Sequence, residues 1–74
     1  MKEGFVFEGN AYRIVRMYPV KREGYILVST VPCFDENNFE EVDGFDFESN
    51  FYKIVKATEG ISKVFRCEKK RCKS

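Results

Sequence analysis

The chain has 74 residues, of which 43% are hydrophobic, 16% aromatic and 34% charged, and its net charge is +1. A chain of this length forms a single domain, over 1–74, and buries only about 60% of its unfolded surface, so it is marginally stable alone. It contains no histidine, which excludes histidine general bases, histidine-containing triads and mixed Cys/His zinc sites.

The composition also bears on the location of the protein. No apolar run approaches the roughly 18 residues of a membrane span. The start, Met1-Lys2-Glu3-Gly4, lacks the apolar core of a signal peptide, so we expect a cytoplasmic location and no membrane partner. Glutamate far outnumbers aspartate, and glutamine and tryptophan are absent, usage that hints at a thermophilic source.

Two segments of the chain are similar to each other. Residues 4–16 (GFVFEGNAYRIVR) and 44–56 (GFDFESNFYKIVK) are identical at eight of thirteen positions. We interpret this similarity as an internal duplication, with repeats over 4–31 and 44–67. Two copies are too few for a solenoid, so we expect them to pack together into one small barrel or sandwich.

Each copy is expected to form a three-stranded meander. Alternation places Phe5 and Phe7 on one face of a first strand, and the second copy repeats the pattern. Gly9-Asn10 and Ser49-Asn50 predict tight hairpin turns, in which the asparagine adopts a positive φ or caps the turn. The F-x-F-x-x-N-x-Y pattern resembles hairpins of SH3-like and related small barrels, a likeness that implies a fold and no function.

The second strands, over 11–18 and 51–58, carry two cations three residues apart, Arg13 and Arg16 or Lys53 and Lys56. A regular strand would point such a pair to opposite faces. A β-bulge at Ile14-Val15 and at Ile54-Val55 would turn both apolar residues inward and both cations outward. The alternative is a strand covered on both faces, with Arg16 snorkelling at its end.

Third strands are expected over 25–31 and 61–67. The first is apolar and should be central, whereas Ser62, Lys63 and Arg66 interrupt the second and predict an edge strand. The fold class is therefore all-β, a small barrel or sandwich of five to six antiparallel strands built from two duplicated meanders. The predicted core is Phe5, Phe7, Tyr12, Ile14, Leu27, Phe45, Phe47, Tyr52, Ile54 and Phe65.

An acidic connector over 32–43 joins the copies. Asp35 could cap a single helical turn, so an α+β fold with one short helix in 35–42 is the alternative. Otherwise the connector is an acidic loop held in place by Phe34 and Phe39.

Charge is segregated along the chain. Residues 1–31 carry +2, residues 32–48 carry −7 and residues 49–74 carry +6. The basic tail, 68–74, predicts contact with RNA or DNA, extended by cations of the strands and by base stacking on Tyr18 or Tyr25. A solvated terminus, or a tail folded onto the acidic segment of its own or another subunit, are the alternatives. The nucleic-acid-binding candidates are Arg13, Arg16, Lys53, Lys56, Arg66, Lys69, Lys70, Arg71 and Lys73.

Catalytic chemistry has weak support. Cys33, Cys67 and Cys72 lack a histidine base, and we expect free thiols rather than a disulfide or a metal site. Glu8 and Glu48 are expected to point outward rather than form a carboxylate dyad. No nucleotide-binding or nucleophile-elbow motif is present. We therefore expect a small non-enzymatic binding module without cofactor or metal.

Protein recognition is the alternative function. It would use a sheet edge or the acidic connector, with Phe34, Phe39, Glu40 and Glu41 as contact candidates. The marginal stability of so small a domain also favours a homodimer.

Overall fold

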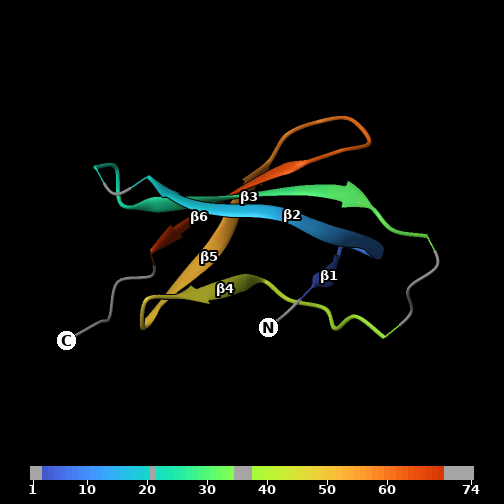
Figure 1. Cartoon of the computed structure of the whole chain (residues 1–74), viewed down its shortest axis with the longest axis horizontal. Helices are drawn as coiled ribbons and strands as arrows, with labels where there is room; N and C mark the ends of the chain where they lie inside the picture. Colours follow the sequence, from blue (N-terminus) through green and yellow to red (C-terminus); the bar gives the residue numbers. More distant parts are fainter. Residues whose placement is uncertain (1–2, 21, 35–37, 70–74) are drawn as a thin grey trace.

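The structure is a computed structural model that describes residues 3–20, 22–34 and 38–69, and it is a single antiparallel sheet (Figure 1). The order of its strands is β1-β2-β3-β6-β5-β4. The strands are β1 (Gly4–Phe7), β2 (Asn10–Val20), β3 (Tyr25–Pro32), β4 (Gly44–Phe47), β5 (Asn50–Ala57) and β6 (Val64–Lys69). The prediction of an all-β domain with five to six antiparallel strands is confirmed.

The described residues form no helix, and so none that is long and apolar enough to cross a membrane. Residues 38–43 of the acidic connector are irregular, with one parallel bridge between Val6 and Glu41. The helical turn that was the alternative for 35–42 is therefore absent from its described part. The expected cap, Asp35, lies outside the described residues.

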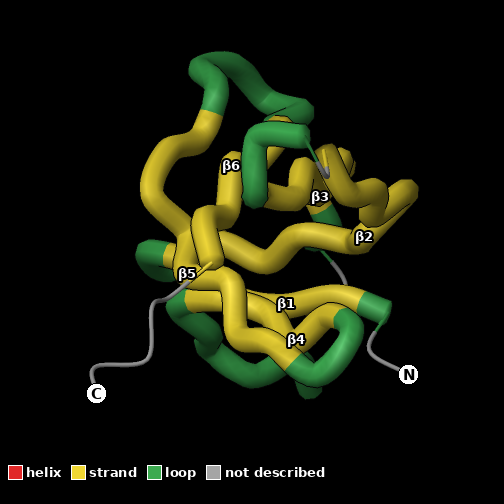
Figure 2. The backbone as a smooth tube through the Cα atoms, turned by 90° about the vertical axis from the view of Figure 1, so that its left-hand side faces the viewer, coloured by secondary structure: helices red, strands yellow, loops and turns green. Residues whose placement is uncertain are grey.

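The sheet curls so strongly that side chains of its first and last strands touch, although these two strands do not pair (Figure 2). Phe5 of β1 and Phe45 of β4 belong to opposite ends of the strand order, yet their ring centroids are 5.0 Å apart in an edge-to-face arrangement. The outer edge of β1 is covered by the connector, since the Val6 N–H donates to the carbonyl of Glu40 and the Val42 N–H donates to the carbonyl of Val6. The result is a half-barrel whose concave side holds the core.

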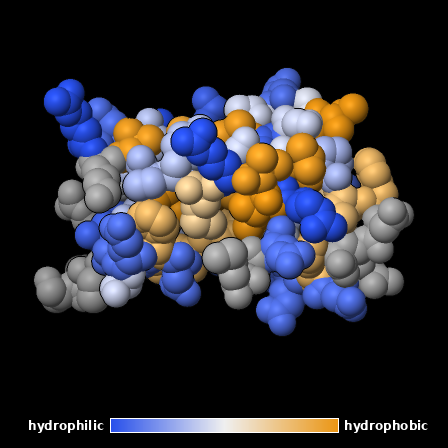
Figure 3. All heavy atoms as spheres, viewed as in Figure 1, coloured by the Kyte–Doolittle hydropathy of each residue, from blue (hydrophilic) through white to orange (hydrophobic). Residues whose placement is uncertain are grey.

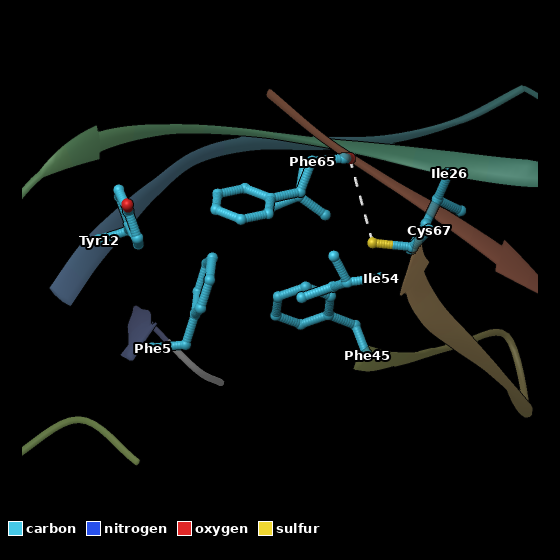
Figure 4. Packing of buried hydrophobic residues seen from close by; sticks show 8 residues of the cluster. Phe5, Tyr12, Ile26, Phe45, Ile54, Phe65 and Cys67 are labelled. Carbon is cyan, nitrogen blue, oxygen red and sulfur yellow. Dashed lines mark hydrogen bonds between the residues drawn. The ribbon is translucent and has the colours of Figure 1, made fainter. Parts of the chain in front are cut away.

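Four of the eight buried core residues are aromatic, and Phe65 lies among them (Figure 4). Phe65 packs edge-to-face against Phe5, Phe7 and Tyr12 at centroid distances of 5.2, 5.3 and 5.2 Å. The prediction for Leu27 is wrong: Ile26 and Val28 are fully buried, so the residue between them faces outward. The buried hydrophobic residues are Phe5, Tyr12, Ile26, Val28, Phe45, Ile54, Phe65 and Cys67.

The other predicted core residues are half-buried. They pack against the cluster at its margin, where the half-barrel is open. They are Phe7, Ile14, Phe47 and Tyr52.

Both hairpin turns form one residue earlier than predicted, at 8–9 and 48–49, and of the two alternatives for the asparagine the capping role is confirmed. The asparagine side chains cap the turns, Asn10 on the carbonyl of Glu8 and Asn50 on that of Glu48. Positive φ belongs instead to the two residues before each asparagine, 52° and 83° in the first turn and 50° and 70° in the second. Two successive positive φ values are typical of type I′ turns, whose twist matches that of the flanking strands.

The two predicted bulges are confirmed, and they repeat at the same offset as the sequence similarity. The register shifts between Ile14 and Arg16 and again between Ile54 and Lys56. The expectation that both apolar residues turn inward is wrong, because Val15 is 61% and Val55 is 51% exposed. Only the isoleucine of each pair reaches the core, and the valine is the extra residue of the bulge.

The hairpins of β1–β2 and β4–β5 share one register, displaced by 40 residues: Phe5 pairs with Tyr12 as Phe45 pairs with Tyr52. A duplication as the origin of this symmetry stays a prediction.

The expected edge position of the last strand is wrong, because β6 lies between β3 and β5. Arg66 and Glu68 lie on its outward face and Lys69 is exposed at its last position, so the strand needs no open edge to keep these charges in water.

Candidate nucleic-acid interface

The outer, convex face of the sheet is the side away from the core. Since Ile26 and Val28 of β3 are buried, Leu27 and Ser29 point outward, and so do the residues paired with them. Ser29 pairs with Arg16 of β2, and Leu27 pairs with Arg66 of β6. On the far side of β6, Lys56 of β5 pairs with Arg66, and Lys53 pairs with Glu68.

Six side chains on this convex surface define what we call the cationic face. Four are cations that the sequence analysis singled out, and two are the tyrosines at the outward positions of the β2–β3 hairpin, where Tyr18 pairs with Leu27 and Tyr25 pairs with Glu68. The cationic face consists of Arg16, Tyr18, Tyr25, Lys53, Lys56 and Arg66.

The bulges bring the cations onto one face. Arg13 pairs with Val31 and Arg16 pairs with Ser29, and these two partners lie on the same side of β3. In β5, Lys53 and Lys56 likewise pair with Glu68 and Arg66, two residues apart on β6. The extra residue of each bulge thus converts a three-residue spacing into a same-face spacing.

Each tyrosine of the cationic face is covered by an arginine. The guanidinium carbon of Arg66 lies 4.1 Å from the centroid of the Tyr25 ring, and that of Arg16 lies 5.0 Å from the centroid of the Tyr18 ring. Both distances fall within the range of cation–π contacts. Arg66 also forms an ion pair of 3.1 Å with Glu68. The two guanidinium groups are therefore held against aromatic rings and not free in solvent.

Acidic residues border the cationic face beside β2, because Glu40, Glu41, Asp43 and Asp46 line the same open pocket as Arg16. Of the outward-facing residues in β2, β3, β5 and β6, all within the described ranges, Glu68 is the one acid. The side of the half-barrel formed by the connector and β4 carries five exposed acids and no described cation. In Figure 3, which is coloured by hydropathy and not by charge, hydrophilic side chains lie along the lower margin and others lie along the upper margin. These acids are Glu40, Glu41, Asp43, Asp46 and Glu48.

Two of the predicted nucleic-acid contacts that lie on strands fall outside the cationic face. Arg13 lies further along β2, where it forms an ion pair of 3.6 Å with Glu3 and donates to the sulfur of Cys33 at 3.8 Å. Lys69 is exposed but follows Glu68 on β6, so it projects from the opposite face. The remaining tail candidates, Lys70, Arg71 and Lys73, lie outside the described residues.

The candidates for protein contact have different environments. Phe34 is 89% exposed. Phe39 is half-buried over β1, where its ring occupies the space that a side chain at Gly4 would need. Glu40 and Glu41 have exposed side chains, and their backbone follows the edge of β1. Phe39 and the backbone of the connector therefore complete the fold, and Phe34 is the aromatic residue free for a partner.

The thiols and carboxylates form no catalytic arrangement within the described part of the chain. Cys67 is fully buried, and this burial raises the pKa of its thiol from 9.0 to about 12. Cys33 is half-buried, and both of these cysteines are free. Glu8 and Glu48 are exposed turn residues, as expected. No group of three potential metal ligands occurs among the described residues, and Cys72 lies outside them.

Sequence reasoning missed two members of the convex surface. Leu27 lies in an uninterrupted apolar run, which carries no period to show which residues face inward. The predicted tail begins at Glu68, although the run Arg66-Cys67-Glu68 alternates polar and apolar residues as a strand does. That alternation is the signal that could have extended the last strand.

Comparison of the chain with protein-family models, with curated proteins and with solved structures found no match of any of the three kinds.

Proposed function

We propose that this domain binds nucleic acid through the cationic face. One observation carries the proposal: four cations from three strands converge on one convex surface together with two tyrosines, and among the described outward-facing residues of β2, β3, β5 and β6 the one acid is Glu68. Cations neutralise phosphates, and aromatic rings stack on bases, so this pairing of residue types suits a polynucleotide better than a simple anion.

The two kinds of cation have different tasks in this proposal. Lys53 and Lys56 have exposed side chains on β5, and as flexible point charges they contact phosphates without regard to sequence. Arg16 and Arg66 are already oriented by tyrosines, so less conformational entropy is lost when they bind. Because Glu68 offsets part of the charge of Arg66, we expect about three phosphates to be neutralised at once, which gives a slope of log K against log salt of about −2 for a single strand.

The test is fluorescence anisotropy with a labelled mixed-sequence 12-nucleotide RNA and its DNA counterpart, titrated between about 50 and 200 mM salt. The double variant Lys53→Glu/Lys56→Glu should raise the Kd at least ten-fold and flatten the salt slope. The matched control is Lys69→Glu, which also replaces a β-strand lysine by glutamate but on the opposite face of β6. It should change the Kd by less than three-fold.

Two results would contradict the proposal. Absence of binding by the unchanged domain at 50 mM salt would exclude it. If Lys69→Glu weakens binding more than the double variant does, the nucleic acid binds at the face of β6 that carries Lys69 and not at the cationic face.

Protein recognition remains the second candidate, supported by one feature. Phe34 and Ile61 are 89% and 75% exposed and line the same shallow pocket at the end of β3, together with Pro32 and Cys33. Exposed large apolar side chains that cluster in this way are typical of protein contact sites. A partner captured by the unchanged domain and lost with Phe34→Ser, but retained with Lys53→Glu/Lys56→Glu, would favour this function.

A further inference from the structure

We infer that the ligand of the cationic face is a single strand, with two neighbouring unpaired bases stacked on the Arg16–Tyr18 and Arg66–Tyr25 pairs. This inference rests on the proposed function and adds to it the strandedness of the ligand and the two positions that hold its bases.

The two arginine–tyrosine pairs form adjacent platforms. Tyr18 pairs with Leu27, and Tyr25 is two residues before Leu27 on β3, so the tyrosines are diagonal neighbours on one face of the β2–β3 hairpin. Each ring already carries a guanidinium group, at 5.0 Å for Tyr18 and 4.1 Å for Tyr25. Planar guanidinium groups and aromatic rings both stack on bases. Each pair can therefore receive one base.

The spacing of the platforms favours separated bases. Diagonal neighbours on adjacent strands are roughly 7–8 Å apart, whereas stacked bases in a duplex rise by only about 3.4 Å. Two consecutive bases can reach both platforms only if they come apart from each other. A single strand can spread its bases in this way without loss of base pairs, while a duplex must break pairs to do so.

The width of the face argues against insertion into a duplex groove. The cations extend from Arg16 on β2 to Lys56 on β5, with β3 and β6 between them. Three strand spacings of about 4.8 Å amount to roughly 14 Å, which exceeds the roughly 12 Å width of the B-DNA major groove. A convex sheet of this width meets a duplex only at its phosphates, and the tyrosines then contribute nothing.

The experiment compares the binding of single strands with that of duplexes. It also distinguishes the contribution of each tyrosine's aromatic ring from that of its apolar volume. Kd values are measured at 100 mM salt for the 12-nucleotide RNA and DNA strands and for the matching duplexes. Tyr18→Leu and Tyr25→Leu keep apolar bulk without a ring, and Tyr18→Phe and Tyr25→Phe keep the ring. We expect each leucine variant to weaken single-strand binding roughly ten-fold, each phenylalanine variant to stay within two-fold, and duplexes to bind at least ten-fold more weakly than single strands.

A second readout reports stacking directly. The chain has four tyrosines and no tryptophan, so its intrinsic fluorescence comes from tyrosine alone. Tyr12 is buried and Tyr52 packs against Phe47 at a centroid distance of 6.2 Å, so bound bases should quench chiefly Tyr18 and Tyr25. Saturating single strand should quench the unchanged domain, and the Tyr18→Leu/Tyr25→Leu variant should lose most of that quenching.

The outcomes distinguish this inference from the proposed function. If duplexes and single strands bind equally, and the leucine variants bind normally while Lys53→Glu/Lys56→Glu does not, nucleic-acid binding stands and the stacking inference is overturned. If no nucleic acid binds the unchanged domain, both are overturned. Preference for the RNA or for the DNA strand identifies the sugar, and weaker binding of both duplexes than of the strands supports a single-stranded ligand. Circular dichroism of every variant shows whether its sheet is intact.

Discussion

Val28 of β3 and Phe65 of β6 face each other at the centre of the sheet, and the pairing of the two halves is symmetric about them. Ile26 pairs with Cys67 on one side, and the Thr30 N–H donates to the carbonyl of Lys63 on the other. Val28 and Phe65 are both fully buried. They occupy equivalent positions in the two halves, since Met17 of β2 pairs with Val28 and Ala57 of β5 pairs with Phe65. The two halves of the sheet therefore share one core.

Replacement of Phe65 should strongly destabilise the domain. Its ring packs against Phe5, Phe7 and Tyr12 of the first repeat, and removal of such a ring costs about 3–5 kcal/mol. A domain of this size has a total stability of roughly 4–11 kcal/mol. Urea unfolding followed by circular dichroism should show this loss for Phe65→Ala and less than about 1 kcal/mol for Val64→Ala, its half-buried neighbour on the opposite face. Equal losses would contradict the packing described.

The residues at one equivalent position of the two hairpin turns can be exchanged with each other. Gly9 and Ser49 occupy the same turn position, with φ values of 83° and 70°. A serine in this region is strained by about 1 kcal/mol and a glycine is not. Ser49→Gly should therefore stabilise the domain by about 1 kcal/mol, and Gly9→Ser should destabilise it by a similar amount. Thermal unfolding should give shifts of opposite sign, and shifts of the same sign would argue against equivalent turns.

Two buried glycines should not tolerate a methyl group. A Cβ at Gly4 would overlap the ring of Phe39 and the carbonyl oxygen of Tyr12, and one at Gly44 would overlap the ring of Phe51 and the carbonyl oxygen of Tyr52. Gly4→Ala and Gly44→Ala should each cost about 1–3 kcal/mol in free energy of unfolding.

The control for these two glycines is Gly24→Asn. Gly24 has a φ of 80° and open space around its Cα, and asparagine tolerates positive φ, so this change should cost less than about 1 kcal/mol. A cost at Gly4 or Gly44 no larger than that of the control would contradict the close backbone approach at these positions.

The buried thiol of Cys67 should make stability fall in alkaline solution. Its pKa is 9.0 when exposed and about 12 in the fold, so between these values the unfolded chain loses a proton that the folded chain retains. Ionisation then favours the unfolded state, and the free energy of unfolding decreases as the pH rises from 9 towards 12. Cys67→Ala should flatten this part of the pH profile.

Alkylation measures the same burial independently. In a Cys33→Ser/Cys72→Ser variant the one remaining thiol, Cys67, should resist iodoacetamide in the native state at pH 8 and react fully in denaturant, because only the exposed thiolate is nucleophilic. Rapid modification of the folded variant would show that Cys67 is accessible.

Local features of this fold could be predicted from the sequence because they depend on near neighbours. A type I′ turn needs only two residues at positive φ between two extended runs, and the cations three residues apart indicated a bulge. The alternation of Phe5 with Phe7 and of Phe45 with Phe47 placed the first strand of each hairpin correctly. The cations named as contacts included the four that the sheet brings together.

Only the tertiary structure decided which strands are neighbours and which side of each is covered. Leu27 faces outward, and β6 is central, because β3 and β6 pair through Val28 and Phe65. An apolar run carries no signal for its inward face until a second layer covers one side. Arg66 lies against Tyr25 only because β3 pairs with β6. That pairing makes neighbours of two residues that are 41 apart in the sequence. The cationic face is thus a product of long-range register, which local sequence does not encode.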